Sequence, residues 1–170
     1  MSSATQLSRP AGIAGWLRRR RWDRQPTDPA WVLIASTGEP IPEAAVNRAV
    51  TLSGGEPVAV VSIARIYGSA LGLPNPGLMP TQKELGAQRD RVAQTLAAVE
   101  QAGVPGSGQV AATRRPGRTI ARVAGAHSVR HIVLVAPAQP RWRRLVEGDL
   151  VRELGRRLPP GVSIEAVTPG

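Results

Sequence analysis

Few residues in this sequence have types and spacings that could do catalytic or metal chemistry. The two histidines, His127 and His131, fall on an expected helix and at the start of an expected strand, where packing roles are commoner than metal ligation. Asp149 and Glu153 are four residues apart, so they share a helix face and could form an acid–base pair. Helix capping and an ion pair of Glu153 with Arg157 explain this spacing more simply. No nucleophile is accompanied by a base and an orienting group, so we predict neither an enzyme nor a metal site.

The composition indicates a single domain whose core lacks large aromatic side chains. A chain of 170 residues can bury one substantial core, and without phenylalanine that core must consist of valine, alanine, leucine and isoleucine. The absence of cysteine excludes disulfides, thiolate catalysis and cysteine-ligated zinc. No apolar run approaches the ~20 residues of a membrane span, and no apolar signal segment follows the N-terminal arginines. We therefore expect a cytoplasmic protein.

Positive charge is distributed unevenly along the chain. The formal net charge is +10, and Lys83 is the only lysine among the 22 basic residues. Residues 101–146 contain eight arginines and no acidic residue. These arginines include the patch Arg114, Arg115 and Arg118 and the group Arg141, Arg143 and Arg144. A further block comprises Arg18, Arg19, Arg20 and Arg21. This asymmetry predicts an anionic partner, such as RNA, a ribonucleoprotein or an acidic protein, unless it reflects only a general preference for arginine on solvated faces.

Residues 1–30 differ in character from the rest of the chain. They are rich in serine, arginine, proline and aspartate, and they show no sustained periodicity, so we interpret them as a flexible basic arm. Within the arm, Ile13, Trp16 and Leu17 have the spacing of a short amphipathic helix, which could contact a membrane surface or a partner. Residues 31–170 are expected to form the folded domain.

Short apolar runs alternate with helical patterns from residue 31 onward. We expect strands at residues 31–36, 57–64, 108–112, 131–136 and 162–167. Helices are expected from Pro42 to Gly54, from a Thr81–Glu84 capping box to Gly103, through 120–127, and over 145–158. This alternation predicts βαβ units, and therefore an open, mostly parallel five-stranded α/β sheet with helices on both faces.

The order of these elements over residues 31–167 resembles the universal stress protein family. The first strand ends in Ala-Ser-Thr-Gly at 35–38, where the family usually has Asp-Gly. Residues 116–124 and the apolar strand after them look like the third helix and fourth strand of the family. The Arg-Arg-Leu-Val-Glu-Gly segment at 143–148 looks like its basic turn into the last helix. The resemblance implies an adenine-nucleotide α-hydrolase-like fold with strand order 3-2-1-4-5.

The phosphate-binding glycines of the family are missing from the matching segment. Nucleotide-binding members carry two glycines three residues apart, and then Gly-Ser or Gly-Thr ten residues later, so that the backbone and a hydroxyl can approach phosphate. Counting back from Gly148, the two glycine positions fall on Val135 and Ala138, and a register shifted by one residue places them on Ala136 and Gln139, neither of which is glycine. The hydroxyl position falls on Asp149, whose carboxylate would repel phosphate.

Two further departures affect the same predicted site. Thr37 stands where the family has an acid at the end of the first strand, and Pro137 and Pro140 each remove an amide donor from the loop. We therefore expect no resident cofactor, with binding of ATP or AMP lost or weak. The residues that remain as nucleotide- or anion-binding candidates are Thr37, Gly38, Arg141, Arg143, Arg144, Gly148 and Asp149.

Three functional hypotheses follow from the sequence. The first is a non-enzymatic regulatory or interaction module, for which the resemblance implies a homodimer formed through the last strand at Val162, Ile164 and Ala166. The second is an RNA- or ribonucleoprotein-associated protein that uses the basic arm and an arginine-rich edge with Trp142 available for stacking. The third is a stress protein that still binds ATP or AMP.

Overall fold

The computed structural model describes residues 30–66, 79–135 and 150–168. These residues form a five-stranded parallel sheet with the order β3-β2-β1-β4-β5. The strands are β1 (Val32–Ser36), β2 (Val58–Arg65), β3 (Gly106–Thr113), β4 (His131–Val135) and β5 (Ser163–Val167). The predicted α/β class, the parallel pairing and the strand order are all confirmed.

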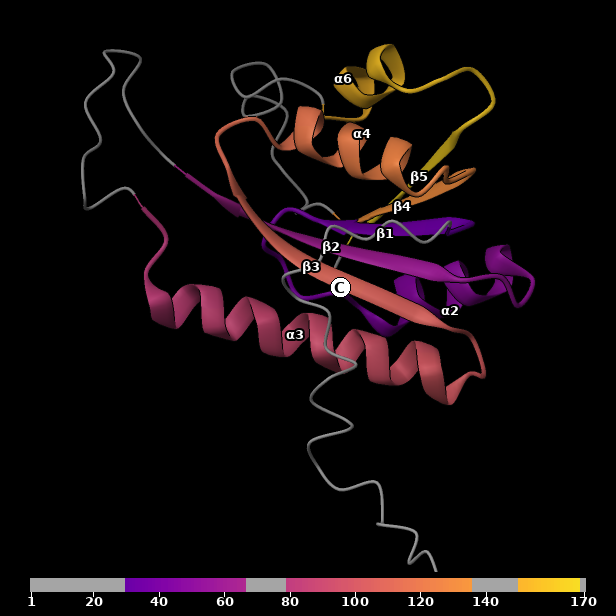
Figure 1. Ribbon diagram of the computed structural model, residues 1–170, viewed down its shortest axis with the longest axis horizontal. Helices are drawn as coiled ribbons and strands as arrows, with labels where there is room; N and C mark the ends of the chain where they lie inside the picture. Colours follow the sequence, from indigo (N-terminus) through magenta and orange to yellow (C-terminus); the bar gives the residue numbers. More distant parts are fainter. Residues whose placement is uncertain (1–29, 67–78, 136–149, 169–170) are drawn as a thin grey trace, which may run out of the picture.

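Four helices cover the sheet, two on each face (Figure 1). Helices α2 (Glu43–Ser53) and α3 (Gln82–Gln101) pack on one face, and α4 (Pro116–Ala126) and α6 (Leu150–Arg157) pack on the other. The first helix begins one residue later than expected, because Pro42 lies before it in an extended conformation. The expected start of the last helix, at residues 145–149, lies outside the described residues.

Strand β1 lies at the centre of the sheet and is completely buried. Leu33 and Ala35 point into the apolar cluster beneath α4 and α6, whereas Val32 and Ile34 point into the cluster beneath α2 and α3. All four side chains are 0% exposed. A parallel strand that is covered on both faces reads as a continuous apolar run, and this is why the sequence located β1, β2 and β4 well.

Strand β3 is longer than the sequence predicted. Its first residues include glycines, which add nothing to the apolar pattern from which a strand is predicted. It pairs with β2 from Gly106 onward, whereas the apolar pattern suggested a start at residue 108. A Cβ atom added at Gly108 would lie 2.6 Å from Cγ1 of Val92 and 2.9 Å from Cδ1 of Leu96. The glycine therefore allows α3 to lie directly on the strand.

Helix α3 begins at the capping box that the sequence predicted. The Thr81 hydroxyl accepts a hydrogen bond from the Glu84 backbone N–H at 3.2 Å, and the Glu84 carboxylate accepts from the Thr81 backbone N–H at 2.6 Å. The Thr81 hydroxyl also donates to the Glu84 carboxylate at 3.0 Å. These bonds satisfy amide groups that the first helical turn leaves without partners, and they lower the pKa of Glu84.

A methyl group at Gly108 should destabilise the fold. We expect Gly108→Ala to lower the free energy of unfolding by about 1–3 kcal/mol, because the added Cβ overlaps Val92 and Leu96 on α3. The matched variant Gly86→Ala lies within α3 and meets no atom within 4 Å, so it should raise stability by about 0.5–1 kcal/mol. Urea unfolding followed by circular dichroism measures both changes. Equal stability of the two variants would contradict the packing described for β3.

The charge on Glu84 should stabilise the fold in a pH-dependent way. Its folded-state pKa lies below the ordinary value of 4.5, because the Thr81 backbone N–H and then the Thr81 hydroxyl stabilise the carboxylate. This contribution is present above the unfolded-state pKa and is lost as pH falls through the lowered folded-state pKa. Thermal unfolding should therefore show Glu84→Gln less stable than the wild type at pH 7, with the difference shrinking as pH falls through the lowered folded-state pKa of Glu84.

A second glutamate on the same helix provides the control for that measurement. Glu100 lies in the last turn of α3, where a negative charge opposes the helix dipole. We expect Glu100→Gln not to lower the melting temperature at pH 7. A Glu84→Gln difference that persists unchanged at low pH would contradict the role of the charged capping box.

Candidate functional site

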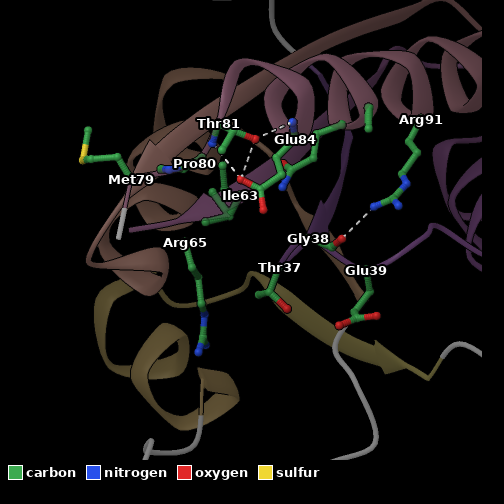
Figure 2. A pocket seen from close by; sticks show the side chains of 13 residues that line it. Thr37, Gly38, Glu39, Ile63, Arg65, Met79, Pro80, Thr81, Glu84 and Arg91 are labelled. Atoms are coloured by element: carbon green, nitrogen blue, oxygen red, sulfur yellow. Dashed lines mark hydrogen bonds between the residues drawn. The ribbon is translucent and has the colours of Figure 1, made fainter. Parts of the chain in front are cut away.

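A pocket of about 520 Å³ lies at the carboxyl ends of β1 and β2, beside the first turns of α3 (Figure 2). Ligands of open α/β sheets bind at this edge, because loops from adjacent strands diverge there. The turn after β1 contributes Thr37, Gly38 and Glu39, and the end of β2 contributes Ile63 to Arg65. Two of the predicted site residues, Thr37 and Gly38, therefore line a pocket.

The turn after β1 depends on a glycine and on hydrogen bonds to both sides. Gly38 has φ +103°, a conformation that side-chain-bearing residues rarely adopt, and its carbonyl accepts a hydrogen bond from Arg91 at 3.0 Å. The buried Ser36 hydroxyl donates to the Glu39 carbonyl at 2.6 Å. Arg91 reaches this turn from α3, so the turn and the helix are held together across the pocket (Figure 2).

Helix α3 supplies a line of polar side chains to the pocket wall. Glu84, Gln88 and Arg91 recur at helical spacing and all line the pocket. The Ser62 hydroxyl of β2 donates a hydrogen bond to the side-chain amide oxygen of Gln88 at 3.1 Å. Sequence reasoning missed Gln88, Arg91 and also Arg65 as site residues. The signal that could have found them is the spacing of 84, 88 and 91 on the face of α3 that is turned toward the strand ends.

The pocket combines charges of both signs, and several of its charged groups already have partners. The Glu84 carboxylate accepts a hydrogen bond from the Thr81 backbone N–H in the capping box, and Arg91 donates a hydrogen bond to the Gly38 carbonyl. Arg65 projects from β2 on the side opposite α3, since residues 61 and 63 of that strand pack beneath α4 and α6 (Figure 2). The arrangement suits binding of a small polar group. Its lining residues include no histidine or cysteine.

Helix α3 points its amino terminus at this pocket, but that terminus is already neutralised. A free helix amino terminus attracts phosphate through its unpaired amides and its dipole. Here the Glu84 carboxylate lies 2.6 Å from the Thr81 backbone nitrogen, so a negative charge already stands where phosphate would bind. This negative charge disfavours an anion at the start of α3.

The carboxyl end of β4 is filled by a side chain at the position where the resemblance placed a glycine. Val135 is 0% exposed and packs in the cluster beneath α2 and α3. It is the last residue of β4, it pairs in register with Ser36 and Val167, and its carbonyl accepts from the Thr37 N–H at 3.4 Å. The residue thus belongs to the sheet and its core.

The two histidines lie at the opposite end of the sheet from the pocket. His131 is the first residue of β4, and its Nδ1 lies 2.7 Å from the Ser163 hydroxyl on β5. His127 is 0% exposed at the end of α4. In the described residues no group of histidine, cysteine, aspartate and glutamate side chains could hold a metal ion. His127 is therefore packed in the interior, and His131 lies at the start of its strand.

The described part of the basic patch lies in the turn from β3 to α4. Arg114, Arg115 and Arg118 are exposed there and line a hollow of about 540 Å³ with Thr113. Glu153 of α6 bonds to Arg157 at 3.1 Å, which confirms the ion pair expected from sequence. The remaining predicted site residues lie outside the described residues; these are Arg18, Arg19, Arg20, Arg21, Arg141, Trp142, Arg143, Arg144, Gly148 and Asp149.

The three residues predicted for a dimer strand lie at one edge of the sheet. Val162 and Ile164 pack partly against the cluster beneath α4 and α6, and Ala166 is exposed. On the other face of β5, Glu165 forms an ion pair with Arg48 of α2 at 2.8 Å. Among the described strands β5 pairs only with β4. No helix in the described ranges is long and apolar enough to cross a membrane.

Comparisons by sequence and by structure give different results for this chain. No protein-family model matches it, and neither does any curated protein sequence. The universal stress protein UspA from Lactobacillus plantarum superposes with a TM-score of 0.60 at 15% identity, covering 82% of this chain and 98% of its own. A universal stress protein in complex with cAMP superposes with a TM-score of 0.56 at 12% identity, and the match covers 84% of this chain and 100% of the other.

A third solved structure has the same architecture. The universal stress protein from Archaeoglobus fulgidus in complex with dAMP gives a TM-score of 0.50 at 12% identity, covering 80% of this chain and 96% of its own. The match in each case spans nearly the whole of the other protein. Together with the strand order, these superpositions show that the chain has the fold of the universal stress proteins.

Proposed function

We propose that the protein is a non-enzymatic regulatory or interaction module of the universal stress protein family, which does not bind ATP through the family's phosphate loop. The observation that carries this proposal is the burial of the Val135 side chain. A valine side chain that is fully buried in the core of the sheet stands where a nucleotide-binding member needs bare backbone.

The pocket beside α3 supports the same proposal. Its only helix amino terminus among the described residues is capped by the Glu84 carboxylate, and Thr37 replaces the acid that the family places there. The pocket retains polar groups that could hold a base or sugar, including Gln88 and the Gly38 turn. Two structural neighbours are described in complex with dAMP and with cAMP. Any residual affinity in this chain would come from such polar contacts, without a phosphate contribution.

Family resemblance and the free edge of β5 support a homodimer. Ser163 N donates to Arg130 O at 2.9 Å, so the amide of Ser163 points toward β4. Amides alternate in direction along a strand, and those of Ile164 and Ala166 therefore point to the free edge. An exposed strand edge is a ready template for pairing with a second copy.

Calorimetric titration with ATP and AMP tests the nucleotide part of the proposal. We expect dissociation constants no tighter than about 1 mM, equivalent to about −4 kcal/mol, with ATP binding no more tightly than AMP. The ratio of the two affinities isolates the contribution of the β- and γ-phosphates. Micromolar binding of ATP, or ATP binding tenfold more tightly than AMP, would overturn the proposal. A universal stress protein that binds nucleotide serves as the positive control.

Proline at the free edge of β5 tests the dimer. Ala166→Pro removes an outward amide without breaking a bond to β4, so we expect a dimer-to-monomer shift in light scattering at micromolar concentration with little change in melting temperature. The matched variant Glu165→Pro removes an inward amide and should lower the melting temperature as well. A wild-type chain that is already monomeric would contradict this interface.

A further inference from the structure

Charge differs between the two helical layers, which lie on opposite faces of the sheet (Figure 1). Helices α2 and α3 together contain four acidic and four basic residues, so their layer is electrically balanced. Helices α4 and α6 contain five arginines and one glutamate. Because the sheet separates these layers, the net positive charge of the described helices is concentrated on the side of α4 and α6.

The arginines of α4 lie on the face of the helix that is turned away from the core. Ile120 and Val123 of this helix are buried against the sheet, whereas Arg115, Arg118 and Arg122 are exposed. The three arginines are spaced by three and four residues, which places them along one helical stripe. At a rise of 1.5 Å per residue, the stripe is about 10 Å long.

Helix α6 extends this positive surface. Arg156 is exposed, and it lies two residues from the fully buried Leu154, on the outward side of the helix. The one carboxylate of the two helices, Glu153, bonds to Arg157 and lies against Gly117 in the first turn of α4. A Cβ atom at Gly117 would collide with this carboxylate. Neither α4 nor α6 has another carboxylate to neutralise the outward arginines.

We propose that the α4–α6 face, defined by Arg115, Arg118, Arg122 and Arg156, binds the phosphate backbone of a nucleic-acid duplex without reading its base sequence. Guanidinium groups match phosphate oxygens in bidentate geometry. A duplex carries one negative charge per about 1.7 Å of its axis when both strands are counted, so a length of duplex equal to the α4 stripe carries about six phosphates, and the stripe faces those on one side. This site is separate from the pocket at the strand ends and does not depend on nucleotide binding there.

The composition of the face argues against other anionic partners. Helices α4 and α6 contain no aromatic residue on which a single strand could stack its bases. Val151 is the one large apolar side chain that is well exposed on these two helices, at 39%. Membrane insertion and protein–protein interfaces both need a larger apolar contact area. The regular display of arginine on helices therefore favours a rigid, evenly charged duplex.

Fluorescence anisotropy with labelled duplexes of about 24 base pairs, one of DNA and one of RNA, tests the proposal on the full chain. At about 50 mM salt we expect Arg118→Glu/Arg122→Glu to weaken binding at least tenfold. The matched control Lys83→Glu/Arg89→Glu changes the net charge equally on exposed positions of α3, and it should weaken binding less than about threefold. Comparison of the two double variants distinguishes binding at a localised site on α4 from attraction to the overall charge of the protein.

The salt dependence provides a second, independent readout. In Arg118→Ala/Arg122→Ala, the slope of log affinity for DNA against log salt should fall by about two, one for each lost phosphate contact. No duplex binding at low salt, or equal weakening in the α4 and α3 variants, would overturn the proposal. Binding to phosphatidylserine vesicles without binding to either duplex would overturn it too. Circular dichroism verifies that each variant is folded.

Discussion

The structure depends on burial of the central strands of a parallel sheet on both faces. Parallel strands joined by crossover helices must be covered on each side, and β1 shows the result, since all its side chains are excluded from solvent. This constraint divides the helices into the pair α2–α3 and the pair α4–α6. In the described part of the chain, it leaves the strand ends, the sheet edges and the outer helix surfaces for function.

At the strand ends, the same packing also determines which side chains stand where ligands of open α/β sheets bind. Val135 completes the core beneath α2 and α3, so the chain cannot leave bare backbone at that point without opening a cavity. Glu84 stabilises the start of α3, and in doing so it places negative charge in the pocket. Residues that stabilise the fold therefore occupy positions where a nucleotide-binding relative could place its ligand contacts.

The fold could be predicted from sequence more fully than the site could. Runs such as 58–61 and 132–135 are apolar throughout because both faces of the sheet are covered, so they were recognisable as buried strands. The start of β3 was hidden because Gly106 and Gly108 contribute no apolar pattern, although they pack closely against α3. Gln88 and Arg91 were missed because polar residues on a helix resemble a solvated face. Only the fold shows that this part of α3 borders a pocket.

The layered architecture also explains why a strongly basic chain can fold without self-repulsion in its core. Arginine is placed on the outward stripe of α4 and at the end of α6, where water screens it and where it opposes the helix dipole least. The exception is the amino-terminal turn of α4, next to Arg115 and Arg118. There Gly117 lets the Glu153 carboxylate approach, which supplies negative charge that the first turn of α4 itself lacks. One acid is thus used to join α6 to α4, and the remaining arginines are left to face outward.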